Sequence, residues 1–107
     1  MNTAQEAEAS GYAVIFSARM SDDLRGYDEM IVRMRDLAAK QPGFMGMEST
    51  MQGNHEITIS YWRSLDDIAA WKRHPEHVQA QKLGRVRWYL SYTVRVTRIE
   101  RCYASGT

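Results

Sequence analysis

The 107-residue sequence has little of several features that would assign a protein to a class. Cys102 is its single cysteine, so an internal disulfide is excluded and a reducing, cytoplasmic location is expected. No run of about 18 apolar residues occurs, so we expect no membrane-spanning helix. The polar start MNTAQEAEAS lacks the basic and apolar regions of a signal peptide, and residues 1–10 are predicted to be a disordered tail.

An excess of charge of one sign is also missing. Fourteen basic and 13 acidic residues give a formal net charge of +1, which provides no broad attraction to nucleic acid or to an anionic membrane surface. We therefore expect neither as a partner. The content of 44% hydrophobic and 25% charged residues is ordinary for one folded domain, which we assign to residues 11–103, with a short tail at 104–107.

Alternating and helical hydrophobic patterns follow one another along the chain. Strands are predicted at residues 12–19, 44–51, 56–62 and 90–101, where a change of apolar side near Thr97 indicates a bulge or a new partner. The first helix is predicted to follow the candidate caps Ser21, Asp22 and Asp23 and to end at Pro42-Gly43. Five methionines fall at core-like positions of these elements: Met30, Met34, Met45, Met47 and Met51.

The second helical region contains a proline. Ser64 is the predicted N-cap of its first piece, which includes Trp71. Pro75 disfavours helical angles at His74 but suits the first position of a new helix, so two pieces are predicted. The second piece runs towards Arg87, with Gly84 as a weak point or an early stop.

The order βαββαβ predicts an α+β, ferredoxin-like fold with one antiparallel sheet and the helices on one face. Strand 56–62 places Ile57, Ile59 and Tyr61 on one side and Trp62 on the other, so apolar groups lie on both faces of the sheet. The uncovered face needs a partner. We expect an identical subunit there, with two sheets packed face to face in a homodimer.

The segments "QPGF", "ITISYWRSLDDIAAW" and "EHVQAQKLGRVRWY", with this order of elements, resemble the antibiotic biosynthesis monooxygenase (ABM) family over residues 12–101. The resemblance implies a dimeric α+β barrel. Some relatives oxidise polycyclic aromatic phenols with molecular oxygen and without metal or flavin, whereas others bind haem and break it open. Relatives of the second kind use an asparagine on the first strand, a tryptophan on the second helix and a haem-ligating histidine ten residues later.

The sequence departs from that haem-degrading pattern in two places. Trp71 matches the tryptophan, but Gln81 stands at the position of the histidine, and YAVIFSAR has no asparagine. The resemblance then favours a cofactor-independent monooxygenase that oxidises a small aromatic or quinol-like compound with molecular oxygen. A fold does not fix an activity. Three alternatives stay open: a non-catalytic small-molecule binder, a haem-binding dimer, and a haem-degrading enzyme with altered ligation.

His77 is the candidate catalytic base, because a neutral imidazole can take a proton from a phenol or an activated carbon. Candidate substrate contacts are the donors Gln81, Arg85 and Tyr61, the walls Trp71 and Phe16, and His74. Gly84 either leaves room for a ligand beside Arg85 or only caps the helix. The alternative for His77 is a half-exposed helix residue with a structural hydrogen bond.

His74 and His77 also form an H-x-x-H pair. On a continuous helix such a pair can share a metal ion, but Pro75 breaks the helix between them and no third ligand is near in the sequence. We therefore expect no metal site.

Overall fold

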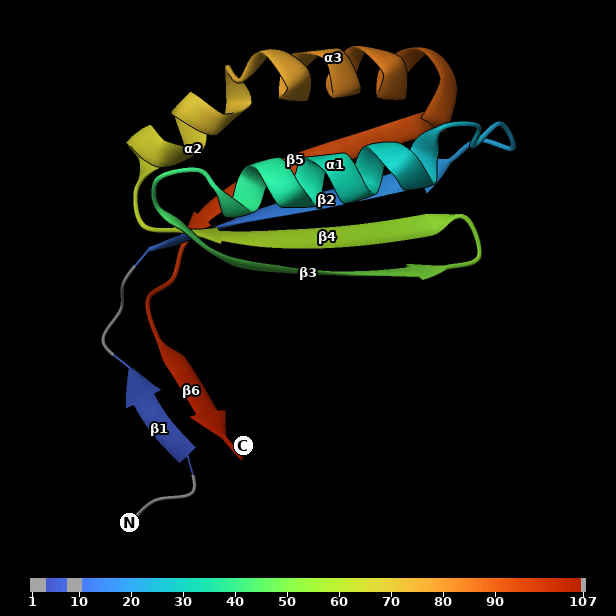
Figure 1. The fold of residues 1–107 in the computed structure, drawn as a ribbon. Coiled ribbons are helices and arrows are strands. Elements are labelled where there is room, and N and C mark those ends of the chain that lie inside the picture. Colours follow the sequence, from blue (N-terminus) through green and yellow to red (C-terminus); the bar gives the residue numbers. More distant parts are fainter. Residues whose placement is uncertain (1–3, 8–10, 107) are drawn as a thin grey trace.

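The computed structural model describes residues 4–7 and 11–106 (Figure 1). The main sheet has the order β3-β4-β2-β5 and is antiparallel throughout. Its helices lie on one face, so the predicted α+β, ferredoxin-like fold is confirmed. The elements of this body are β2 (Tyr12–Met20), α1 (Tyr27–Ala39), β3 (Phe44–Gln52), β4 (His55–Trp62), α2 (Leu65–Lys72), α3 (Pro75–Leu83), the π-helical turn η1 (Gly84–Trp88) and β5 (Tyr89–Arg98).

A second, two-stranded sheet is formed by the ends of the chain. β1 (Ala4–Ala7) pairs antiparallel with β6 (Cys102–Ser105), and the pair projects from the body as an arm (Figure 1). β1 lies within the predicted tail 1–10, and β6 includes Ala104 and Ser105 of the predicted tail 104–107. Residues 1–3, 8–10 and 107 of these tails lie outside the described residues. The strand expected over residues 90–101 ends at Arg98, and Thr97 stays in regular register with Ala13, so the bulge or new partner expected near Thr97 is wrong. The chain takes a new partner only from Cys102, where β6 pairs with β1.

The first helix begins later than its candidate caps indicated. Gly26 is its N-cap, with a φ of +80° that favours glycine, and the helix starts at Tyr27. Ser21 and Asp23 instead form hydrogen bonds within the loop that precedes the helix. The Ser21 hydroxyl donates to the Arg87 carbonyl over 2.5 Å.

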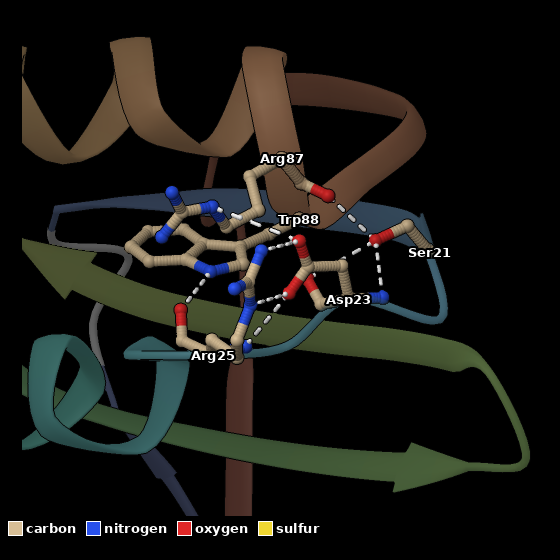
Figure 2. Close-up of polar contacts among 5 residues, drawn as sticks. All are labelled: Ser21, Asp23, Arg25, Arg87 and Trp88. Carbon is tan, nitrogen blue, oxygen red and sulfur yellow. Dashed lines mark hydrogen bonds and ion pairs between the residues drawn. The ribbon is translucent and has the colours of Figure 1, made fainter.

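That loop is fastened to η1 by further polar contacts (Figure 2). The guanidinium of Arg25 donates to both carboxyl oxygens of Asp23 over 2.8 Å, and this hydrogen bonding lowers the pKa of Asp23 to about 2. The Trp88 indole N–H donates to the Arg25 carbonyl over 2.9 Å. These bonds hold the start of α1 against the end of the second helical region.

The second helical region is divided as predicted. Ser64 caps α2 by accepting from the Asp67 N–H over 3.1 Å, and α2 ends at Lys72. The His74 imidazole Nδ1 accepts from the Glu76 N–H over 3.2 Å and so caps α3, with Pro75 in its first turn. None of the helices in the described part of the chain is long and apolar enough to cross a bilayer.

Gly84 follows α3 and has no open space beside it. A Cβ at this position would overlap the ring of Tyr89, which occupies the volume a larger residue would need. The alternative that Gly84 makes room for a ligand is therefore wrong. α3 ends at Leu83, and Gly84, with helical backbone angles, begins the π-helical turn η1.

The core lies between the helices and the sheet in two clusters. One joins Trp62 and Trp71 with Ala38, and the other joins Met20, Tyr27 and Trp88 with Ala18. Two of the methionines expected in the core are exposed. Met45 sits at a bulge of β3 and is 50% exposed, and Met51 near the β3–β4 turn is 43% exposed, whereas Met30, Met34 and Met47 are partly buried.

Candidate functional site

A cavity of about 480 Å³ lies between the helical layer and the sheet. This volume is within the range of pockets that hold small organic ligands. Its walls are mostly apolar: Val14, Phe16, Met30, Ile31, Met34, Ile68, Trp71, Val94 and Val96. Tyr92, Val94 and Val96 line the cavity and are each at least 41% exposed, so the cavity reaches the surface along β5, an edge strand.

A row of four contacting rings forms one end of the cavity. Phe44 meets Trp62 edge-on at 5.4 Å between ring centroids, and Trp62 stacks on Trp71 at 6.3 Å. His77 completes the row, lying nearly parallel to Trp71 at 4.4 Å and 11°. Trp62 is fully buried, so the row is anchored in the core at one end and reaches the cavity at the other.

The imidazole of His77 is held in one tautomer. Its Nδ1 lies 3.1 Å from the Trp71 carbonyl oxygen. A carbonyl only accepts, so Nδ1 carries the proton and donates. In the neutral ring Nε2 is then the acceptor, and no hydrogen bond from a described residue reaches it. Burial lowers the pKa of His77 from its ordinary 6.5, so the neutral form prevails at pH 7.

Five predicted site residues meet at this cavity: Phe16, Trp71, His77, Gln81 and Arg85. Trp71 and His77 come from the two sides of the Pro75 break, which turns α3 so that His77 packs on Trp71. Gln81 lies one turn further along α3, and Arg85 follows in η1.

Tyr61 and His74 do not line the cavity. Side chains alternate along β4, and Trp62 takes the helix-covered face, so Tyr61 lies on the opposite face and donates to Glu48 over 2.6 Å. His74 is used as the cap of α3, and its ring lies at 5.5 Å from Trp71 without reaching the cavity. The prediction that Tyr61 and His74 contact the substrate is therefore wrong.

Glu56 is a cavity residue that the sequence analysis missed. It is 6% exposed, and its Oε2 accepts from the Tyr27 hydroxyl over 2.5 Å. Burial raises the pKa of Glu56 above its ordinary value and that of the neighbouring Tyr89 to about 12. The alternation of side chains along β4 could have indicated this position. Glu56 lies on the same side of the strand as Thr58, Ser60 and Trp62, and this side faces the helices.

Lys72, on α2, is a second missed residue that lines the cavity, and its charge contributes to the low pKa of His77. Among the residues that the structure describes, no three histidine, cysteine or acidic side chains gather as a possible metal site.

Comparisons with known proteins agree with this architecture. The model of the monooxygenase af470-like family matches residues 13–104. The chain belongs to that family. YqjZ of Bacillus subtilis, an uncharacterized protein, is 50% identical over 91 residues, which are 84% of this chain and 80% of YqjZ.

Solved structures share the fold at low identity. A putative antibiotic biosynthesis monooxygenase from Nitrosomonas europaea matches with a TM-score of 0.74 and 12% identity, over 86% of this chain and 92% of that one. A mutant of SnoaB from Streptomyces nogalater, a cofactor-independent oxygenase, matches with a TM-score of 0.71 and 14% identity, over 82% of this chain and 91% of that one. The predicted resemblance to the ABM family is confirmed, and the chain has a monooxygenase-type fold.

Proposed function

We propose that this protein is a cofactor-independent monooxygenase that oxidises a small aromatic or quinol-like compound with molecular oxygen. The observation that carries the proposal is the fixed tautomer of His77. Its Nδ1–H is engaged by the Trp71 carbonyl, which leaves the basic Nε2 available in a mostly apolar cavity. Its lowered pKa keeps this base neutral at pH 7.

The reaction needs no external reductant. His77 takes a proton from a phenol or from a methylene flanked by aromatic rings, and the electron-rich anion passes an electron to oxygen. A methylene and one molecule of oxygen then give a ketone and water, which balances atoms and electrons. The apolar walls exclude water from the anion, and Gln81 and Arg85 are the candidate donors to the substrate oxygen.

The fold supports this reaction class. SnoaB is described as a cofactor-independent oxygenase, and the family to which this chain belongs is a monooxygenase family. The competing function is a non-catalytic binder of small molecules or haem, because a histidine with Nδ1 held by a carbonyl also suits a metal-ligating Nε2.

Oxygen uptake with an anthrone-like substrate tests the proposal. We expect uptake by the wild type and by His55→Ala, since His55 is exposed and contacts Ser17. His77→Ala should reduce kcat about 10²- to 10⁴-fold, the usual contribution of a general base. Turnover that survives His77→Ala would remove His77 as the base. A bound-haem Soret band on adding hemin, with no oxygen uptake, would favour the competing function.

We also propose that the protein is a cytoplasmic homodimer. The face of the sheet away from the helices carries Ile15, Ile57, Ile59 and Tyr61, all partly buried within one chain. A second sheet packed on them would remove this apolar surface from water. The cytoplasmic location is supported by the single cysteine, because no internal disulfide can form. Light scattering that gives a monomer at micromolar concentration would contradict the dimer.

A further inference from the structure

Glu56 and Tyr27 form a polar pair beside the cavity in which one carboxyl oxygen, Glu56 Oε1, receives no hydrogen bond from the described residues. Glu56 is 6% exposed and Tyr27 is 3% exposed. The Tyr27 hydroxyl donates to Glu56 Oε2, and among the described residues no donor reaches Oε1. No fully buried side-chain nitrogen or oxygen of the described residues lacks a hydrogen-bond partner, so Oε1, which receives no donor, is open to the cavity. Because Glu56 lines the cavity, a molecule in the cavity can supply the missing one.

The pair lies far from His77. Glu56 and Trp62 are six positions apart on β4, which is about 20 Å along a strand. Trp62 stacks on Trp71, and Trp71 stacks on His77. The cavity is therefore elongated, with the candidate base near one end, the carboxyl near the other, and apolar walls between them.

The charge around Glu56 favours a neutral donor over a cation. Arg35 on α1 is near enough to lower the pKa of Glu56, and so already compensates part of its charge. The Arg35 guanidinium donates to Ser49, not to Glu56. Tyr27 and Tyr89, beside the carboxyl, form an aromatic surround suited to a planar ring.

We propose that Glu56, with Tyr27, is a subsite that accepts a hydrogen bond from a hydroxyl group on an aromatic ligand. As a statement about substrate it rests on the proposed function: the substrate is then an elongated aromatic compound with a hydroxyl at the end away from His77. A hydrogen bond from a phenol to a carboxylate pushes electron density into the conjugated ring. That makes the ring a better electron donor to oxygen at the far end.

Binding of two matched probes, 2-naphthol and 2-methoxynaphthalene, tests the subsite by calorimetry without turnover. The ether cannot donate. We expect the wild type to bind 2-naphthol about tenfold more tightly, as for one hydrogen bond to a charged acceptor. The double variant Glu56→Leu with Tyr27→Phe replaces both polar partners by apolar groups, which limits the cost to folding. We expect this double variant to bind the two probes with about equal affinity.

Two controls make the outcome decisive. Glu29→Gln alters an exposed glutamate on α1 that does not line the cavity, and should keep the tenfold preference. Glu56→Gln keeps the Tyr27 bond but removes the charge, and should give an intermediate preference. Equal binding of the two probes by the wild type, or an unchanged preference in the double variant, would overturn the proposal.

His77→Ala separates this inference from the proposed function. If His77→Ala abolishes the preference and the Glu56 double variant keeps it, the hydroxyl binds at the His77 end and the subsite is wrong. If no variant or wild type consumes oxygen but the Glu56-dependent preference is found, the monooxygenase function fails and the subsite stands.

Discussion

His77 and Trp71 are joined twice, once ring to ring and once through the backbone. Their rings lie 4.4 Å apart at an angle of 11°, and the His77 Nδ1 lies 3.1 Å from the carbonyl oxygen of the same tryptophan. One residue therefore both covers the imidazole and fixes its tautomer. Six positions separate the two in sequence, and the break at Pro75 brings them together.

The first prediction concerns the pH dependence of turnover. Burial lowers the pKa of His77 below 6.5, so the neutral, basic form is lost only in more acidic solution. We expect kcat/KM to rise with pH through a pKa below 6.5 and to be flat above it. Trp71→Ala should expose the imidazole and move this pKa towards 6.5, with lower activity. NMR titration of the His77 ring measures the shift directly; an unchanged pKa would contradict the role given to burial.

The second prediction concerns the stability cost of Glu56. Burial raises its pKa in the folded state above the ordinary 4.5, so its ionisation weakens the fold as pH rises through the folded-state pKa. Glutamine keeps an acceptor for Tyr27 and cannot ionise. Glu56→Gln should therefore have a higher Tm than wild type at pH 7, and the difference should shrink as the pH falls towards 4.5. A gain that grows at low pH would have the wrong sign.

The third prediction concerns Gly84. Its α-helical backbone accepts any residue, so the obstacle is the Tyr89 ring alone, which is packed between Phe16, Tyr27 and Tyr92. Gly84→Ala should lower the free energy of unfolding by about 1–3 kcal/mol, as overpacking does. Tyr89→Leu removes the ring. Urea denaturation of the double variant should show a loss smaller than the sum of the two single losses.

The fourth prediction concerns the proposed dimer. Glu48 on the edge strand β3 and Arg95 on the edge strand β5 lie in one row across the uncovered face, through Ile59 and Ile15. With a two-fold axis parallel to the strands, Glu48 of each copy faces Arg95 of its partner. Glu48→Arg or Arg95→Glu alone should weaken the dimer at least about fivefold, and the two together should restore it. Sedimentation measures the dissociation constants; a double variant no tighter than either single variant would exclude this axis.

Much of the fold could be predicted from the sequence because its signals are local. The alternation in Ile57–Trp62 placed Trp62 and Tyr61 on opposite faces, and the structure agrees. Ser64 and Pro75 carry their own conformational preferences, so the cap and the helix break were found where expected. The start of α1 was misplaced, because Ser21 and Asp23 are good caps in isolation but are used by Arg87 and Arg25.

The candidate site was predicted in part. Trp71 was expected beside the pocket from the family resemblance, and His77, Gln81 and Arg85 from helical spacing. All four line the cavity. Tyr61 was predicted to contact the substrate because its hydroxyl can donate, although the alternation with Trp62 places it on the opposite face of the sheet. His74 was predicted as a contact without considering that its side chain caps α3. Glu56 was passed over because a lone charged residue in a strand is normally solvated.

The sequence by itself determined the order of the elements, the faces of the strands and the point at which the second helical region divides. These depend on the period of side chains along an element and on proline geometry, which act over a few residues. Only the tertiary structure decided that Tyr27 meets Glu56, that Tyr89 fills the space beside Gly84, and that the Trp71 carbonyl selects the tautomer of His77. Each depends on the distance between atoms brought together by packing, and burial then sets their protonation.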